Sequence, residues 1–177
     1  MTSGAQYQDQ AQHIGDNNFS QLSNLETAVE QIKKAGREDE RLMHILEELA
    51  DYITDRPERE ILGLEEKLKR GSRSELFERA KELKNKFARR VAKNQMSKTE
   101  QLVYIQILAA INTAWHQMIR PRIIAGAMNP EIDQLILEKL IQPVHQAIVR
   151  FDQSITTETV SGMLYFLTGK CHLKWEA

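Results

Sequence analysis

The chain has 177 residues, of which 41% are hydrophobic and 28% charged, and its formal net charge is −1, as in ordinary soluble globular proteins. Its length suffices to bury a core without metals, and the single cysteine, Cys171, excludes an internal disulfide and fits a reducing compartment. The start lacks the features of a signal peptide, and no apolar stretch reaches the roughly 18 residues of a membrane span, so we predict a cytoplasmic protein.

The first third of the chain changes from a polar leader to charged helices. Residues 1–20 are polar and Gln-rich without periodicity, which predicts a flexible tail or a pairing arm. Helical spacing of apolar residues predicts a helix that ends at Gly36 and a second over residues 38–54. Pro57 should end or bend the second helix, after which an apolar stripe continues to Gly71.

A basic helix is expected after Gly71. Ser72 and Glu75 have the spacing of a capping box, and an apolar stripe follows at Leu76, Ala80, Leu83, Phe87 and Val91. Residues 37–64 carry nine acidic and four basic side chains, whereas residues 65–95 carry five acidic and eleven basic ones. Oppositely charged helices in sequence favour an antiparallel helical hairpin, although a solvated helix face accounts for the same pattern.

The last eighty residues predict a more apolar bundle. Ser97 and Glu100 form a second capping box before the most apolar helix, residues 100–120, which we expect at the centre and interrupted by Pro121. Asn129 before Pro130 marks the start of the next helix, which Pro143 should kink. A last helix over residues 157–168 ends at Gly169, and residues 170–175 alternate as in an extended segment.

These elements predict an all-α fold, a helical bundle with a charged helical hairpin in its N-terminal half. We divide the chain into a flexible polar tail at residues 1–20, a charge-rich helical region at residues 21–95 and an apolar C-terminal helical bundle at residues 96–177.

Motifs for catalysis or metal binding are missing from the sequence. It contains no Gly-x-x-x-x-Gly-Lys, His-Glu-x-x-His, Cys-x-x-Cys or Gly-x-Ser-x-Gly pattern. Cys171 and His172 are adjacent, but two ligands fall short of the four of a structural zinc site. We therefore predict no catalytic, cofactor or metal site and no enzyme activity. A small helical enzyme or metal protein centred on His116, His145, Cys171 and His172 is a further alternative.

The basic stretch also fits direct nucleic-acid binding. Residues 81–93 hold six bases and one acid, Glu82, and phosphate binding needs such a stripe on one exposed face. Interleaved aromatic residues are few and the overall charge is near zero, which weakens this hypothesis. Its candidate DNA contacts are Arg79, Lys86, Arg89, Arg90 and Lys93.

The C-terminal run Gly162 to Trp175, GMLYFLTGKCHLKW, resembles the end of small proteins and domains of bacterial ABC-three-component defence systems, to which Lamassu-type anti-phage systems belong. The resemblance implies the small middle component, a non-catalytic accessory subunit bridging an SMC/Rad50-like ABC ATPase and an effector nuclease. Any contact with nucleic acid would then be indirect, through the complex.

Two groups of side chains are candidates for contact with such partners. Aromatic and apolar residues near the C-terminus could anchor a partner, because tryptophan and tyrosine are enriched in binding hot spots. The same residues equally suit a packed core, and cations at a helix end equally suit the helix dipole. The candidate partner-binding residues are Tyr165, Phe166, Leu173, Trp175, Arg120 and Arg122.

Overall fold

A computed structural model describes residues 25–30, 47–53, 62–92, 97–170 and 172–177. After a helical segment at residues 25–30, the helices are α2 (Glu47–Ile53), α3 (Leu64–Arg70), α4 (Phe77–Ala92), α5 (Lys98–Ala114), α6 (Arg120–Ile124), α7 (Asn129–Ile136), α8 (Gln142–Val149) and α9 (Thr157–Gly169). No β-strand occurs in these ranges, so the predicted all-α fold is confirmed. Nor does any of their helices combine the length and apolarity that crossing a membrane requires.

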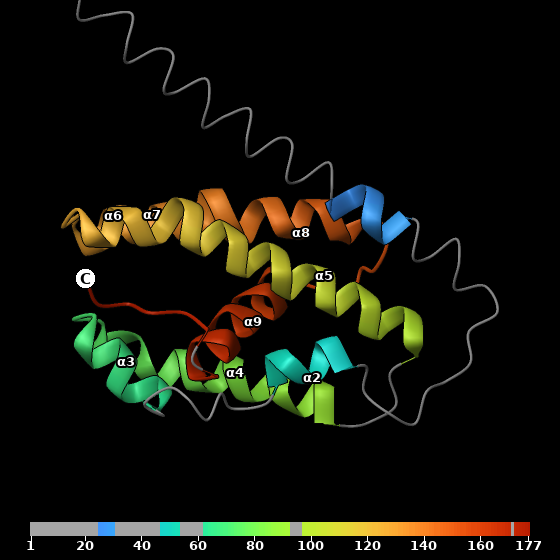
Figure 1. Cartoon of the computed structure of the whole chain (residues 1–177), viewed down its shortest axis with the longest axis horizontal. Coiled ribbons are helices and arrows are strands. Elements are labelled where there is room, and N and C mark those ends of the chain that lie inside the picture. The colour runs from blue at the N-terminus through green and yellow to red at the C-terminus, as the bar shows by residue number, and fades with distance from the viewer. Residues whose placement is uncertain (1–24, 31–46, 54–61, 93–96, 171) are drawn as a thin grey trace, which may run out of the picture.

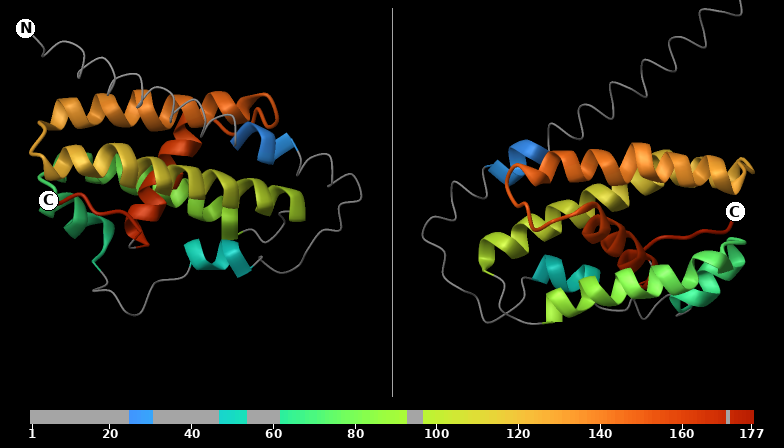
Figure 2. Two further views of the ribbon diagram at one scale, coloured as in Figure 1. Left: turned by 45° about the horizontal axis from the view of Figure 1, so that its top comes forward. Right: turned by 180° about the vertical axis from the view of Figure 1, so that it is seen from behind.

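The last helix, α9, lies at the centre of the molecule. It sits between a layer made of α5 to α8 and a layer that contains α3 and α4 (Figures 1 and 2). Its side chains are buried on nearly every side, at Val160, Met163, Leu164, Phe166, Leu167 and Thr168. We predicted that residues 100–120 would be central. They contribute a large buried face, but α9 is the helix that both layers cover.

The basic helix α4 packs against α9 through the apolar stripe that the sequence predicts, Ala80, Leu83, Phe87 and Val91. The two backbones come close at Gly162, where an added Cβ would lie 2.7 Å from the carbonyl oxygen of Leu83. The described residues thus give α4 a different main partner from the acidic helix of the predicted hairpin. Of the acidic region, α2 packs against α5, and residues 31–46 and 54–61 lie outside the described ranges.

One apolar core joins the two predicted helical regions. The ring of Phe87, from the charge-rich region, meets the rings of Tyr104 and Phe166 edge to face at 5.9 and 5.2 Å between centroids. Leu49 and Leu68 also belong to this core. The division after residue 95 therefore does not separate two cores, because α4 buries its apolar face against the C-terminal helices.

Two prolines lie inside continuous helices instead of ending them. A π-helical turn at Trp115–Ile119 precedes Pro121, and a second at Leu137–Ile141 precedes Pro143. In each turn a main-chain N–H donates to the carbonyl five residues earlier, Arg120 to Trp115 and Gln142 to Leu137. The wider turn accommodates a residue that lacks an N–H and crowds the preceding carbonyls. The predicted interruption at Pro121 is therefore wrong, because the helix continues to Ile124.

The predicted caps have different outcomes. The capping box at Ser97 is confirmed, with Glu100 N–H donating to Ser97 Oγ at 3.2 Å and Ser97 N–H to Glu100 Oε2 at 2.8 Å. The one at Ser72 is wrong. Ser72 has a φ of 54°, and the carboxylate of Glu75 accepts from Arg73 Nε instead. Asn129 is the first residue of α7 rather than its cap, and its amide donates to Ser72 O at 3.0 Å.

The close approach at Gly162 gives a stability prediction. We expect Gly162→Ala to lower the free energy of unfolding, because a backbone carbonyl cannot move aside and overpacking costs about 1–3 kcal/mol, more than alanine's gain of about 1 kcal/mol in a helix. Gly169→Ala is the matched control on the same helix, since its Cβ would meet only the flexible Lys84 Cδ at 3.3 Å. Urea unfolding followed by circular dichroism measures both, and equal stability of the two variants would refute the close contact.

Candidate partner-binding surface around Trp175

The segment after α9 turns back across the molecule. Main-chain N–H groups of Lys170 and His172 donate to Phe166 O and Leu167 O, both at 3.0 Å, which ends the helix. The chain then runs toward the end of the molecule where α3 lies opposite the turn between α6 and α7 (Figure 1). It has no strand partner among the described residues, yet Leu173 and Trp175 are buried and Lys174 between them is exposed, as the alternating pattern suggests.

The indole of Trp175 is held by contacts from three sides. Its Nε1–H donates to Thr168 Oγ1 at 3.0 Å, and its ring lies 4.7 Å from that of Trp115 and 6.3 Å from that of Tyr165, with which it is stacked. A Cβ on Gly71 would lie 2.6 Å from Trp175 Cβ. Glycine at the end of α3 therefore provides the space in which the main chain at Trp175 lies.

Arg73 connects three segments that are distant in sequence. Its side chain is 2% exposed, its Nε donates to Glu75 Oε1 at 2.9 Å, and its Nη2 donates to Asp133 Oδ1 on α7 at 2.5 Å. Its Cζ lies 5.7 Å from the centroid of the Trp175 ring, a cation–π distance. The guanidinium thus joins the turn before α4, helix α7 and the C-terminal segment. Sequence patterns did not single out Arg73, because it is one of many bases in residues 65–95.

The electrostatics at Arg73 are those of a buried guanidinium paired with two exposed carboxylates. Burial alone would lower the pKa of Arg73, but hydrogen bonds from its guanidinium to Glu75 and Asp133 outweigh burial and raise it. The hydrogen bond that Arg73 donates to Glu75 lowers the pKa of Glu75. The third guanidinium nitrogen, Nη1, is buried and has no hydrogen-bond partner among the described residues.

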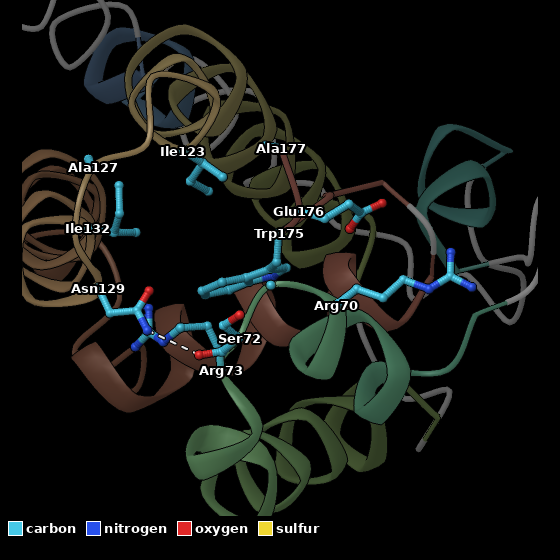
Figure 3. Close-up of a pocket in the computed structure, with 11 residues that line it drawn as sticks. Arg70, Ser72, Arg73, Ile123, Ala127, Asn129, Ile132, Trp175, Glu176 and Ala177 are labelled. Carbon is cyan, nitrogen blue, oxygen red and sulfur yellow. Dashed lines mark hydrogen bonds between the residues drawn. The ribbon is translucent and has the colours of Figure 1, made fainter.

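A pocket of about 270 Å³ opens beside these groups, and we call it the Trp175 pocket. Ile123 and Ile132 point into the space above the Trp175 ring, and the polar residues Ser72, Arg73 and Asn129 lie along one side (Figure 3). The remaining lining residues are Arg70, Gly71, Ala127, Glu176 and Ala177. The turn between α6 and α7 thus forms an apolar wall opposite the indole.

Two large apolar side chains lie exposed beside this wall. Ile124, next to Ile123, is 59% exposed, and Met128, between Ala127 and Asn129, is 74% exposed. Among the described residues the third exposed large apolar side chain is Leu137, at 48%, and none of the three lines the pocket itself. Apolar side chains gathered beside a hollow are typical of an interaction surface.

The other predicted partner-binding residues take different places. Phe166 and Leu173 are buried in the core, and Tyr165 is partly buried under the Trp175 ring, where burial raises its pKa. Arg120 donates to the main-chain oxygen of Glu176 and so holds the C-terminal segment. Arg122 is exposed and pairs with Glu131 at 2.7 Å. Of the six predicted residues, only Trp175 lines the Trp175 pocket.

The candidate DNA contacts lie mostly along a second groove, of about 460 Å³, which Leu83, Phe87 and the start of α9 also line. Glu158 accepts hydrogen bonds from Lys86 and Arg79, which lower its pKa, and Arg90 donates to Ser154 Oγ at 2.6 Å. Arg89 is exposed and has no ion pair among the described residues, whereas Lys93 lies outside them. Most of this basic charge is thus engaged within the chain.

The histidines do not form a cluster with other ligands in the described part of the chain. His116 Nε2 lies 3.3 Å from the main-chain oxygen of His172, whose ring lies 5.3 Å from that of Tyr52. Within the described ranges, no group of three or more His, Cys, Asp or Glu side chains gathers where a metal could bind. His145 is half-buried on α8, and Cys171 lies outside these ranges.

Comparison with known proteins adds one match. Residues 63–175 match the family model of C-terminal domain 9 of the ABC-three component (ABC-3C) systems. The match covers more than half of the 177 residues, from the residue before α3 to Trp175, and so includes α3, α6, α7 and Trp175, which line the Trp175 pocket. No curated protein and no solved structure matches the chain.

The contacts of Trp175 predict a large effect of its removal. We expect Trp175→Ala to lower the free energy of unfolding by about 3–5 kcal/mol, because a buried indole and its hydrogen bond are lost together. Lys174→Ala removes an exposed neighbour and should stay within about 0.5 kcal/mol of the parent chain. Chemical unfolding checks both, and a small loss for Trp175→Ala would contradict the packing described here.

The ion pairs of Glu158 predict a dependence of stability on pH. Lys86 and Arg79 lower the pKa of Glu158 from its ordinary value of 4.5. The contribution of Glu158 to folding stability is therefore present above pH 4.5 and is lost as the pH falls through the lower pKa of the folded state. We therefore expect Glu158→Gln to be less stable than the parent chain at pH 7, with the gap closing on acidification. A gap that persists unchanged to pH 3 in unfolding titrations would rule out this cause.

Proposed function

The chain belongs to the C-terminal domain 9 family of the ABC-three component systems, and we propose that it is a non-catalytic accessory subunit that bridges an SMC/Rad50-like ABC ATPase and an effector nuclease in antiviral defence. The family match carries this proposal. The matched residues coincide with the packed helices α3 to α9 and the C-terminal segment, so the family assignment concerns the folded body and not an isolated motif.

A multi-component system requires surfaces through which its members bind one another. The described part of the chain offers such a surface at the turn between α6 and α7, where Ile124 and Met128 are exposed and their sequence neighbours Ile123 and Ala127 line the Trp175 pocket. Exposed apolar side chains of this kind are typical of surfaces that bind other proteins. This feature supports the binding role without identifying which component binds.

Three finer parts of the proposal rest on the resemblance of residues 162–175 to proteins of ABC-three-component defence systems. They are the role of the chain as the middle component, the Lamassu type of the system and the indirect contact with nucleic acid. The cytoplasmic location follows from the same proposal, because such a complex would act on invading DNA inside the cell.

Direct nucleic-acid binding is the second candidate. Exposed Arg89 and the weakness of surface ion pairs favour it, because phosphates could compete with Glu158 for Arg79 and Lys86. The engagement of Arg79, Lys86 and Arg90 within the chain favours the subunit role instead.

Co-expression tests the proposed function. We expect the affinity-tagged chain, produced together with the proteins encoded by its neighbouring genes, to elute with an ABC ATPase and an effector as one complex. The chain alone should show neither ATP hydrolysis nor DNA cleavage. The control is an unrelated tagged helical protein produced with the same neighbours. Elution of the chain as a free species, with both neighbours soluble and folded, would refute the bridging role.

A further inference from the structure

We propose that the groove between α4 and the start of α9 binds an acidic segment of a partner subunit, and that Arg89 and Arg90 hold a carboxylate of that segment. We call it the α4–α9 groove, and its charged lining residues are Lys86, Arg89, Arg90 and Glu158. The inference rests on the proposed function, because a subunit that bridges two components needs two separate binding surfaces. This groove shares no lining residue with the Trp175 pocket.

The α4–α9 groove carries an excess of positive charge. Three of its lining side chains are cations, and one, Glu158, is an anion. Both carboxylate oxygens of Glu158 are already engaged, since Oε1 accepts from Arg79 at 2.5 Å and Oε2 accepts from Lys86 at 3.1 Å. The single negative charge of the groove is therefore used by two cations other than Arg89 and Arg90.

Arg89 and Arg90 form no ion pair within the described residues. Arg89 is exposed, and Arg90 donates to the hydroxyl oxygen of Ser154 at 2.6 Å and to its main-chain oxygen at 3.3 Å, which are both uncharged. Adjacent residues of a helix do not face each other, yet here both line one groove. Two guanidinium groups at one groove suit a carboxylate, because its two oxygens match their N–H groups.

The exposure of the groove determines the size of its occupant. The side chains of Lys86 and Glu158 are 62% and 47% exposed. A single carboxylate bound at such a surface gains little, because water and salt screen exposed ion pairs. Binding that holds a complex together therefore needs several contacts at once. An acidic segment of a protein provides them, whereas a small carboxylic acid does not.

The lining favours a polypeptide over a nucleic acid. Its aromatic residue, Phe87, is 3% exposed, and its ring meets those of Tyr104 and Phe166 edge to face, so it offers no free face on which a base could stack. Glu158 would repel a strand that carries a phosphate at every nucleotide. A polypeptide can place a carboxylate beside Arg89 and a neutral residue beside Glu158.

Binding titrations of the full chain with each purified neighbouring-gene protein test the groove. Arg89→Glu reverses an exposed charge that forms no ion pair in the described part of the chain, so we expect it to fold normally and to bind one of the two components about tenfold more weakly. Lys81→Glu is the matched control, because it makes the same change of charge at an exposed residue of α4 that does not line the groove. It should bind as the parent does. Thermal melting establishes that both variants fold.

Glu158→Gln distinguishes binding from folding. The substitution removes the carboxylate that competes for Lys86 and Arg79, so we expect the same component to bind about threefold more tightly at low salt, although the free chain is less stable. A residue that acted only in the packing of α9 would weaken binding when it is changed. Unchanged or weaker binding by Glu158→Gln therefore overturns the proposal.

The remaining outcomes separate this proposal from the proposed function. If the parent chain forms the complex and Arg89→Glu binds no more weakly than Lys81→Glu, the groove proposal is wrong and the proposed function stands. If the chain alone binds a fluorescent single-stranded oligonucleotide and Arg89→Glu abolishes that binding, the occupant is a nucleic acid. If the chain alone dimerises and Arg89→Glu makes it monomeric, the occupant is a second copy. Either result overturns the proposal. If the parent chain forms no complex, the proposed function fails and the groove proposal fails with it.

Discussion

The indole of Trp175 can occupy its place because residue 71 has no side chain. A Cβ on Gly71 would overlap that of Trp175, so the end of α3 and the C-terminal segment can lie this close only with glycine at residue 71. From that position the indole bonds to Thr168 on α9, packs on Trp115 in the first π-helical turn and faces the guanidinium of Arg73. Both layers and the central helix are thus tied together at one ring, which is also the floor of the pocket.

Arg73 makes the contact between three distant segments depend on one side chain. Removing a guanidinium from water is costly, and Glu75 and Asp133 offset that cost only for two of its nitrogens. The remaining nitrogen, Nη1, is buried without a hydrogen-bond partner among the described residues, so the hydrogen bonding of this guanidinium is incomplete.

The charge pattern of the chain has a mainly internal role in the described residues. Arg79 and Lys86 reach from α4 to a single carboxylate, Glu158, at the start of α9, and Arg90 reaches Ser154 just before it. These contacts join the two helices beside their apolar contact at Gly162. The basic residues that the sequence suggests as DNA contacts therefore bond within the chain, although such exposed pairs add little stability individually.

The sequence by itself determined the helices and their buried faces, because periodicity and capping act over one or two turns. The apolar stripe of α4 and the capping box at Ser97 are local in this sense, and both were predicted. Only the tertiary structure decided that α4 packs on α9, that Pro121 and Pro143 follow π-helical turns, and that Arg73 meets Asp133 sixty residues away. Those outcomes depend on which apolar surfaces are buried against each other in the folded chain. A local sequence pattern cannot predict the close approach of Gly71 to Trp175 or of Gly162 to Leu83, because these residues are far apart in sequence.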